Sequence, residues 1–170
     1  GFMETSFLHM HSQWEFEDSS RISTVWNIRS EGVAEEFTVS GLPVLPDRYD
    51  WSEGEFSYSY NSSAPVSFGV STRIAGFFGG DILEVRPSVR ARYGETFNVS
   101  LSWSRNDIDL PSGKAVTNLA STRVAYNFSP RLFAQSLLQY NDSADLWSVN
   151  FRFGWLQDAN TGLFIVYNET

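Results

Sequence analysis

The two histidines of this chain, His9 and His11, are the residues with the most evident capacity for chemistry. They stand two positions apart, so on a strand their imidazole rings share one face with Gln13 and Glu15. Imidazole nitrogens and carboxylate oxygens are zinc ligands, and a histidine beside a serine and an asparagine could form a hydrolytic triad. The chain has no third histidine and no cysteine. Two polar residues on a wet strand face explain the pair more simply, so we name no catalytic residue and expect neither a cofactor nor enzymatic activity.

A second candidate is a ladder of charged residues, which we call the charge ladder: Glu84, Arg86, Arg90 and Arg92. Even spacing places all four side chains on one face of a strand. Such a row in the lumen of a pore would bias which solutes pass. The same charges could instead pair with one another and stiffen the wall of a barrel. The sequence leaves both interpretations open.

A third candidate consists of Asn106, Asp107 and Asp109, which we expect in a loop between two strands. Their side-chain oxygens are of the kind that calcium prefers, and calcium could also join such a loop to lipopolysaccharide. The segment lacks the remaining ligands and the glycine of a known calcium loop. An Asx-type turn before Pro111 is the simpler interpretation.

Strands must position these residues, and the segment 147–155 indicates what kind of strands they are. Trp147, Val149, Phe151, Phe153 and Trp155 alternate with polar or small residues. A strand sends successive side chains to opposite faces, so this segment has one apolar face that ends in indole rings. Indoles favour the headgroup level of a bilayer, which is typical of a strand that crosses a membrane.

The same alternation predicts about ten strands. We expect them near 7–16, 22–32, 49–60, 66–74, 82–93, 97–104, 116–128, 132–140, 147–156 and 163–168, with the second continuing through a bulge near Gly32 to Phe37–Val39. The connections 30–48, 75–81, 106–115 and 141–146 look long, and those between them look short. Alternating short and long connections predict an all-β, antiparallel up-and-down transmembrane barrel.

Aromatic residues near the strand ends are expected to form girdles at the two membrane interfaces. These residues are Trp14, Trp26, Phe97, Trp103, Tyr126, Phe128, Tyr140, Trp147, Trp155 and Tyr167. A soluble barrel that binds an apolar ligand would show the same alternation, with the apolar row inside. The bulky charges of the charge ladder favour a wet lumen, and therefore lipid on the apolar side.

Composition narrows the function further. The net charge of -8 argues against a nucleic-acid partner, because binding to phosphates needs a clustered basic surface. No run of about 18 apolar residues predicts a transmembrane helix. Residues 1–6 contain no basic segment followed by an apolar run, so no export signal is expected there. No linker divides the chain, and we expect one unit over residues 1–170.

Several long stretches resemble one family of largely uncharacterised Gram-negative outer-membrane proteins, in which a carbohydrate-binding domain of family-nine type precedes a C-terminal β-barrel. The resemblance covers about residues 20 to 170 and rests on segments 43–51, 76–81, 103–111, 126–133, 139–142, 147–155 and 163–169. It implies a barrel in the outer membrane and no agreed catalytic residues. The carbohydrate-binding domain and the usual terminal aromatic are missing here. We therefore expect a section of a longer protein, completed by further strands or by a partner chain.

From these observations we expect an outer-membrane barrel that acts as a pore or a surface anchor, linked to the handling of carbohydrate or another polymer. Its expected partners are outer-membrane lipid, further strands or chains, and carbohydrate. Two alternatives stay open. One is a scaffold subunit of an outer-membrane assembly or enzyme, and the other is the soluble barrel with an apolar ligand.

Overall fold

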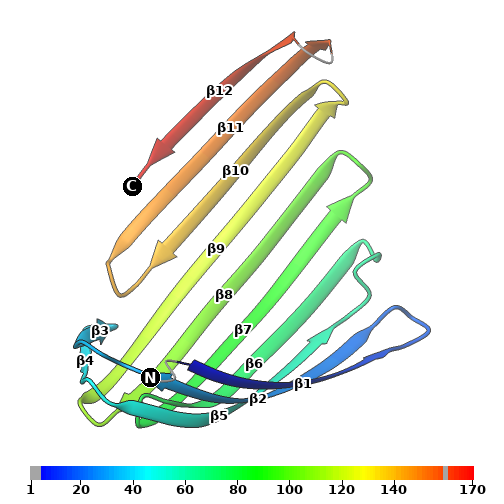
Figure 1. The fold of residues 1–170 in the computed structure, drawn as a ribbon. Coiled ribbons are helices and arrows are strands. Elements are labelled where there is room, and N and C mark those ends of the chain that lie inside the picture. Colours follow the sequence, from blue (N-terminus) through cyan, green and yellow to red (C-terminus); the bar gives the residue numbers. More distant parts are fainter. Residues whose placement is uncertain (1–4, 159–160) are drawn as a thin grey trace.

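The computed structural model describes residues 5–158 and 161–170, and this part of the chain is entirely strands and turns (Figure 1). No helix in it could cross a membrane. The strands are β1 (Thr5–Glu15), β2 (Arg21–Gly32), β3 (Phe37–Val39), β4 (Leu42–Val44), β5 (Arg48–Ser59), β6 (Val66–Phe77), β7 (Gly80–Tyr93), β8 (Phe97–Leu110), β9 (Gly113–Ser129), β10 (Leu132–Asn141), β11 (Leu146–Asp158) and β12 (Thr161–Glu169).

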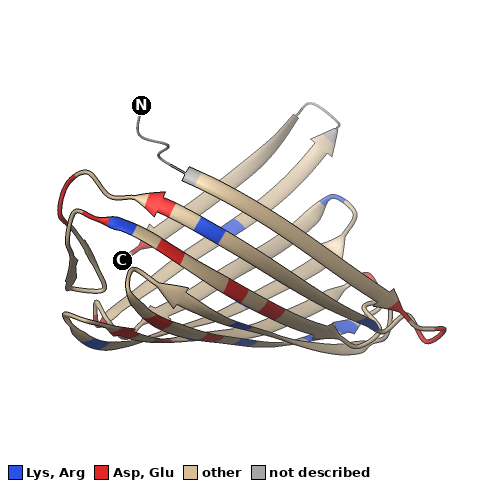
Figure 2. Ribbon diagram, turned by 60° about the horizontal axis from the view of Figure 1, so that its bottom comes forward, with Lys and Arg blue, Asp and Glu red and all other residues tan. Residues whose placement is uncertain are grey.

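Ten of these strands form one antiparallel up-and-down sheet in the order β1-β2-β5-β6-β7-β8-β9-β10-β11-β12. Each strand pairs with the next strand of the sheet along the chain, which short turns allow. The sheet curls into a trough with β1 on one side and β12 on the other (Figures 1 and 2). The two outer strands do not pair with each other, so the sheet of the described residues is open. The prediction of an antiparallel up-and-down sheet is confirmed.

The prediction that β2 continues through Phe37–Val39 is wrong. It pairs with β4 in a separate hairpin through a turn at Ser40 and Gly41, which have φ angles of 50° and 79°. Two successive positive φ values match the tight hairpin turn whose twist suits paired strands. The segment 33–47, closed at its base by a hydrogen bond of 2.8 Å from Val33 to Asp47, is thus a loop that carries its own hairpin.

Two connections that we predicted to be long are tight turns. Phe78 and Gly79 join β6 to β7, and residues 111–112 join β8 to β9. As a consequence, Asn106, Asp107 and Asp109 lie within β8 rather than in a loop, which corrects the prediction. The reason is that Ile108 and Leu110, on the face opposite the Phe97–Trp103 row, are buried in the core at this end of the sheet, so strand pairing is favoured beyond the predicted end.

The buried apolar core is small and lies at one end of the sheet, which we call the hairpin end. It consists of Val44, Ala75, Phe78, Ile82, Ile108 and Leu110. The ring of Phe78 lies 5.4 Å from that of Tyr49 and 5.3 Å from that of Phe37, so the β3–β4 hairpin covers the ends of the long strands. At the same end Gly80 permits β7 to pack closely against β8, because a Cβ there would lie 1.9 Å from the carbonyl oxygen of Asp109.

The register gives the sheet two different faces. Cross-strand partners share a face, and the apolar rows of all ten strands meet on the same one, the apolar face. Side chains on it are open: Trp26 is 48% and Ile74 66% exposed. On the opposite polar face, Glu53 is only 4% exposed. Because side chains converge inside a curved sheet, these values place the polar face inside the trough.

Candidate functional site on the polar face

A buried carboxylate, Glu53 on β5, is the centre of the most developed polar cluster. Arg73 donates two hydrogen bonds to its Oε2, of 3.1 Å from Nε and 2.8 Å from Nη2. Arg29 donates from Nε to Oε1 at 2.9 Å, and Asn27 donates to the same oxygen at 2.6 Å. A carboxylate that is out of water is tolerated only with such partners, so these contacts hold β2, β5 and β6 in one register.

The cluster extends along the polar face in both directions. A ring nitrogen of His9 lies 2.7 Å from the side-chain oxygen of Asn27, which adds β1. On the other side Arg73 lies 3.7 Å from Glu84, and Glu84 in turn pairs with Arg86 on its own strand. We call this set the ion network: it crosses five neighbouring strands, from β1 to β7. Neighbouring charges therefore compensate one another in this part of the trough.

The charge ladder divides into two parts. Its residues share the polar face of β7, but only Glu84 and Arg86 belong to the ion network. Arg92 donates to the backbone oxygen of Ser63 at 2.6 Å. Arg90 has no ion-pair or hydrogen-bond partner among the described residues. The ladder is thus paired toward the hairpin end and open toward the opposite end.

The aromatic residues predicted to form girdles all project from the apolar face. Trp103, Tyr140 and Trp147 belong to one cross-strand row that also includes Ala120, and the last two rings lie 4.7 Å apart. Near the opposite end, Tyr126 lies 6.4 Å from Phe97 and 4.6 Å from Phe128. Trp14 and Trp155 also lie near that end of their strands, Tyr167 lies near the hairpin end, and Trp26 lies midway along β2.

Toward the hairpin end the apolar face gives way to charge, and the limit runs obliquely across the sheet. The cross-strand row that begins at Trp26 on β2 reaches β8 at Asp107. On the apolar face of β8 the last apolar residue is Trp103, four residues before Asp107. On β12 the last apolar residue, Tyr167, pairs with Phe151, four residues short of Trp147. Averaged over the sheet, the apolar band therefore shifts by about one residue per strand, although from Trp103 to Trp147 its limit follows a single row. With a rise of about 3.3 Å per residue and about 4.8 Å between strands, this corresponds to a tilt of about 35°.

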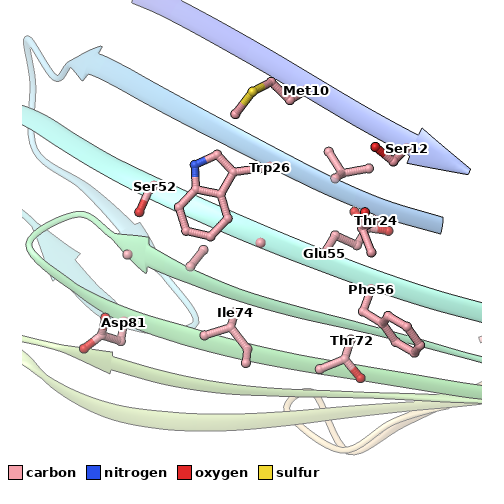
Figure 3. Close-up of a pocket in the computed structure, with 14 residues that line it drawn as sticks. Met10, Ser12, Thr24, Trp26, Ser52, Glu55, Phe56, Thr72, Ile74 and Asp81 are labelled. Carbon is pink, nitrogen blue, oxygen red and sulfur yellow. The ribbon is translucent and has the colours of Figure 1, made fainter.

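The apolar face carries a hollow of about 650 Å³ over β5 (Figure 3). Met10, Trp26 and Ile74 surround it from β1, β2 and β6, and Gly54 lies between them without a side chain. Its lining is mainly apolar and open to the outside of the trough. No arrangement of polar groups in it indicates a reaction.

The metal-site candidates find little support from the local contacts. The rings of His9 and His11 lie on the polar face with centroids 6.3 Å apart. Asp107 pairs with Arg105 at 2.9 Å and Asp109 with Lys114 at 2.5 Å. Within residues 5–158 and 161–170, no group of three His, Asp or Glu residues could hold a metal ion. The two histidines therefore remain an untested prediction.

Outside the long apolar rows, one turn has marked electrostatics. Asp142, between β10 and β11, accepts hydrogen bonds of 2.5 Å from the Asn118 side chain and 2.6 Å from its backbone NH. These bonds favour the ionised carboxylate and hold the pKa of Asp142 below its usual value. The turn is thereby tied to β9.

Sequence reasoning missed the centre of the ion network. Glu53, Arg29 and Arg73 lie on three different strands, and nothing in their spacing along the chain links them. Their shared parity was the only available signal.

Comparison with protein-family models, curated proteins and solved structures finds no match to this chain.

Proposed function

We propose that this chain is a section of a transmembrane β-barrel of the Gram-negative outer membrane. In this arrangement the apolar face meets lipid, and the polar face lines a water-filled lumen that admits solutes or anchors a surface assembly. The oblique apolar band carries the proposal. Its slope of about 35° matches the tilt of about 35–45° that strands adopt in membrane barrels.

The distribution of burial supports the same orientation. A soluble barrel with an apolar ligand needs its apolar row inside the curve, whereas here Ile74 is 66% exposed and Glu53 is enclosed. A sheet that leaves so many large apolar side chains uncovered needs lipid or another protein on that face. The family resemblance points to the same membrane, and the proposed link with carbohydrate or polymer handling rests on that resemblance alone.

The free edges of β1 and β12 imply a completing element. Unpaired backbone groups in hydrocarbon cost several kcal/mol each, so a membrane barrel has to close. β12 is apolar on both faces, since Leu163 and Phe164 project from opposite sides and are both about half exposed. Such a strand suits pairing within a larger sheet. Further strands or a second chain would complete the barrel and define the lumen.

The proposal is tested on the closed barrel, in which this chain is joined by the strands or the second chain that complete it, folded into phosphatidylcholine vesicles and planar bilayers. We expect heat-modifiable migration on gels, quenching of tryptophan fluorescence by brominated acyl chains, and discrete conductance steps. Quenching and heat-modifiability without conductance would favour the scaffold or anchor alternative. A closed barrel that stays in the aqueous phase, folded and unquenched, would overturn the membrane assignment.

A further inference from the structure

The arginines of the polar face are unevenly compensated. Toward the hairpin end Arg29, Arg73 and Arg86 each contact a glutamate of the ion network. Farther along the strands, Arg90 and Arg123 have no acidic partner among the described residues. The chain as a whole carries a net charge of -8, so an uncompensated basic region on this face contrasts with the rest of the molecule.

The two free arginines lie in one cross-strand row. Arg90 on β7 pairs with Ser100 on β8, and Ser100 pairs with Arg123 on β9. One strand therefore separates the two guanidinium groups, at about 10 Å between their backbones. Two strands farther on, Arg152 lies on the same face, where its guanidinium is 5.3 Å from the ring centre of Phe164. The basic region thus extends across β7–β11.

Beside Arg90 the polar face is hollowed by small residues. The hollow measures about 180 Å³, and Arg90 is its one charged lining residue in the described part of the chain. Ser67, Ser88 and Ser100 line it with hydroxyl groups, and Gly69 leaves its floor without a side chain. A guanidinium beside several hydroxyl donors is the chemistry that binds the oxygens of phosphate or carboxylate groups.

We propose that this hollow binds small oxyanions through Arg90, with Arg123 as the second cationic group of the same surface. Its size suits a single phosphate or carboxylate group. In the membrane barrel proposed above, the same arginines would favour passage of anions over cations, and this part of the inference rests on the proposed function. The ion network toward the hairpin end holds three arginines and two glutamates, so its formal charge is +1 and would not oppose that preference.

Binding is tested with inorganic phosphate and the closed barrel in a non-ionic detergent, by isothermal titration calorimetry. We expect saturable binding that weakens at least about tenfold in Arg90→Gln, because a charge-assisted hydrogen bond is lost. Arg105→Gln, which removes an arginine already paired with Asp107, is the matched control and should leave affinity unchanged. Absence of saturable binding, or equal losses in both variants, would overturn the proposal.

A second measurement uses the protein without substitutions, so its result does not depend on whether a variant folds. Phenylglyoxal labels accessible, unpaired arginines, and peptide mass spectrometry locates the label. We expect Arg90 and Arg123 to be labelled and to be protected by phosphate, while Arg73, held by Glu53, is labelled slowly. Labelling of Arg90 that phosphate leaves unchanged would contradict an oxyanion site.

Selectivity is measured separately as the reversal potential in a potassium chloride gradient. We expect anion preference in the wild-type pore and a shift toward cations in Arg90→Gln combined with Arg123→Gln. If phosphate binds but no conductance appears, the oxyanion site stands. The pore of the proposed function is then refuted, and the anion preference that rests on it is refuted as well. If the barrel conducts, prefers cations and binds no phosphate, the oxyanion inference is refuted and the proposed pore stands.

Discussion

An arginine placed on either side of β9 tests which face of the sheet meets lipid. Val124 lies on the apolar face, midway between Ala120 and Phe128, and pairs with Val99 and Ser136. The next residue, Ala125, projects from the polar face. Val124→Arg and Ala125→Arg thus add the same charged side chain to neighbouring positions of one central strand, and they differ in the face that receives it.

For Val124→Arg we expect a loss of about 2–4 kcal/mol in the free energy of folding into a bilayer, the cost of an arginine near the midplane of a lipid-facing strand. At about 1.4 kcal/mol per factor of ten, this lowers the folding constant by roughly 30- to 700-fold. For Ala125→Arg we expect a loss below about 1 kcal/mol, because its guanidinium stays in water. Water and salt screen its repulsion from Arg123 and from Arg92 and Arg152, which lie in the same cross-strand row.

The assay is urea-dependent folding of the closed barrel into phosphatidylcholine vesicles, followed by tryptophan fluorescence and by the heat-modifiable band on gels. Both variants are compared with the wild type at one lipid concentration, and Val124→Ala measures the loss of the valine alone. A larger loss for Ala125→Arg than for Val124→Arg would refute the orientation. Equal and small losses would indicate that neither face of β9 contacts hydrocarbon.

Three further predictions concern stability. Glu53→Gln should cost about 1–3 kcal/mol, measured by urea unfolding, because it removes the charge that accepts hydrogen bonds from Arg29 and Arg73, whose side chains are partly in water. Gly80→Ala should disrupt the hairpin end, since its Cβ would lie 1.9 Å from the Asp109 carbonyl oxygen, and proteolysis of the 33–47 loop should accelerate. Because the folded-state pKa of Asp142 lies below the usual 3.8, its stabilising contribution is complete above that pH and is lost as the pH falls through the folded value. Amide exchange at Asn118 should accelerate in that acid range, and Asp142→Asn should abolish the pH dependence.

Alternation within each segment was sufficient to predict the strands and their faces. The rows around Trp147–Trp155 and in β6 and β9 are long, and a period of two residues has one structural interpretation at that length. The strand ends were less predictable. Asn106, Asp107 and Asp109 have turn-forming side chains, but strand pairing continued through them because Ile108 and Leu110 are buried beneath the hairpin.

Which side chains share a face follows from each segment alone, because parity along a strand is a local property of the backbone. Which parities of different strands meet depends on the register between segments distant in the chain, so it can be read only from the folded sheet. The ion network around Glu53 and the row of Arg90, Ser100 and Arg123 both arise in this way. The slope of the apolar band is likewise a property of ten registers together, and no single segment contains it.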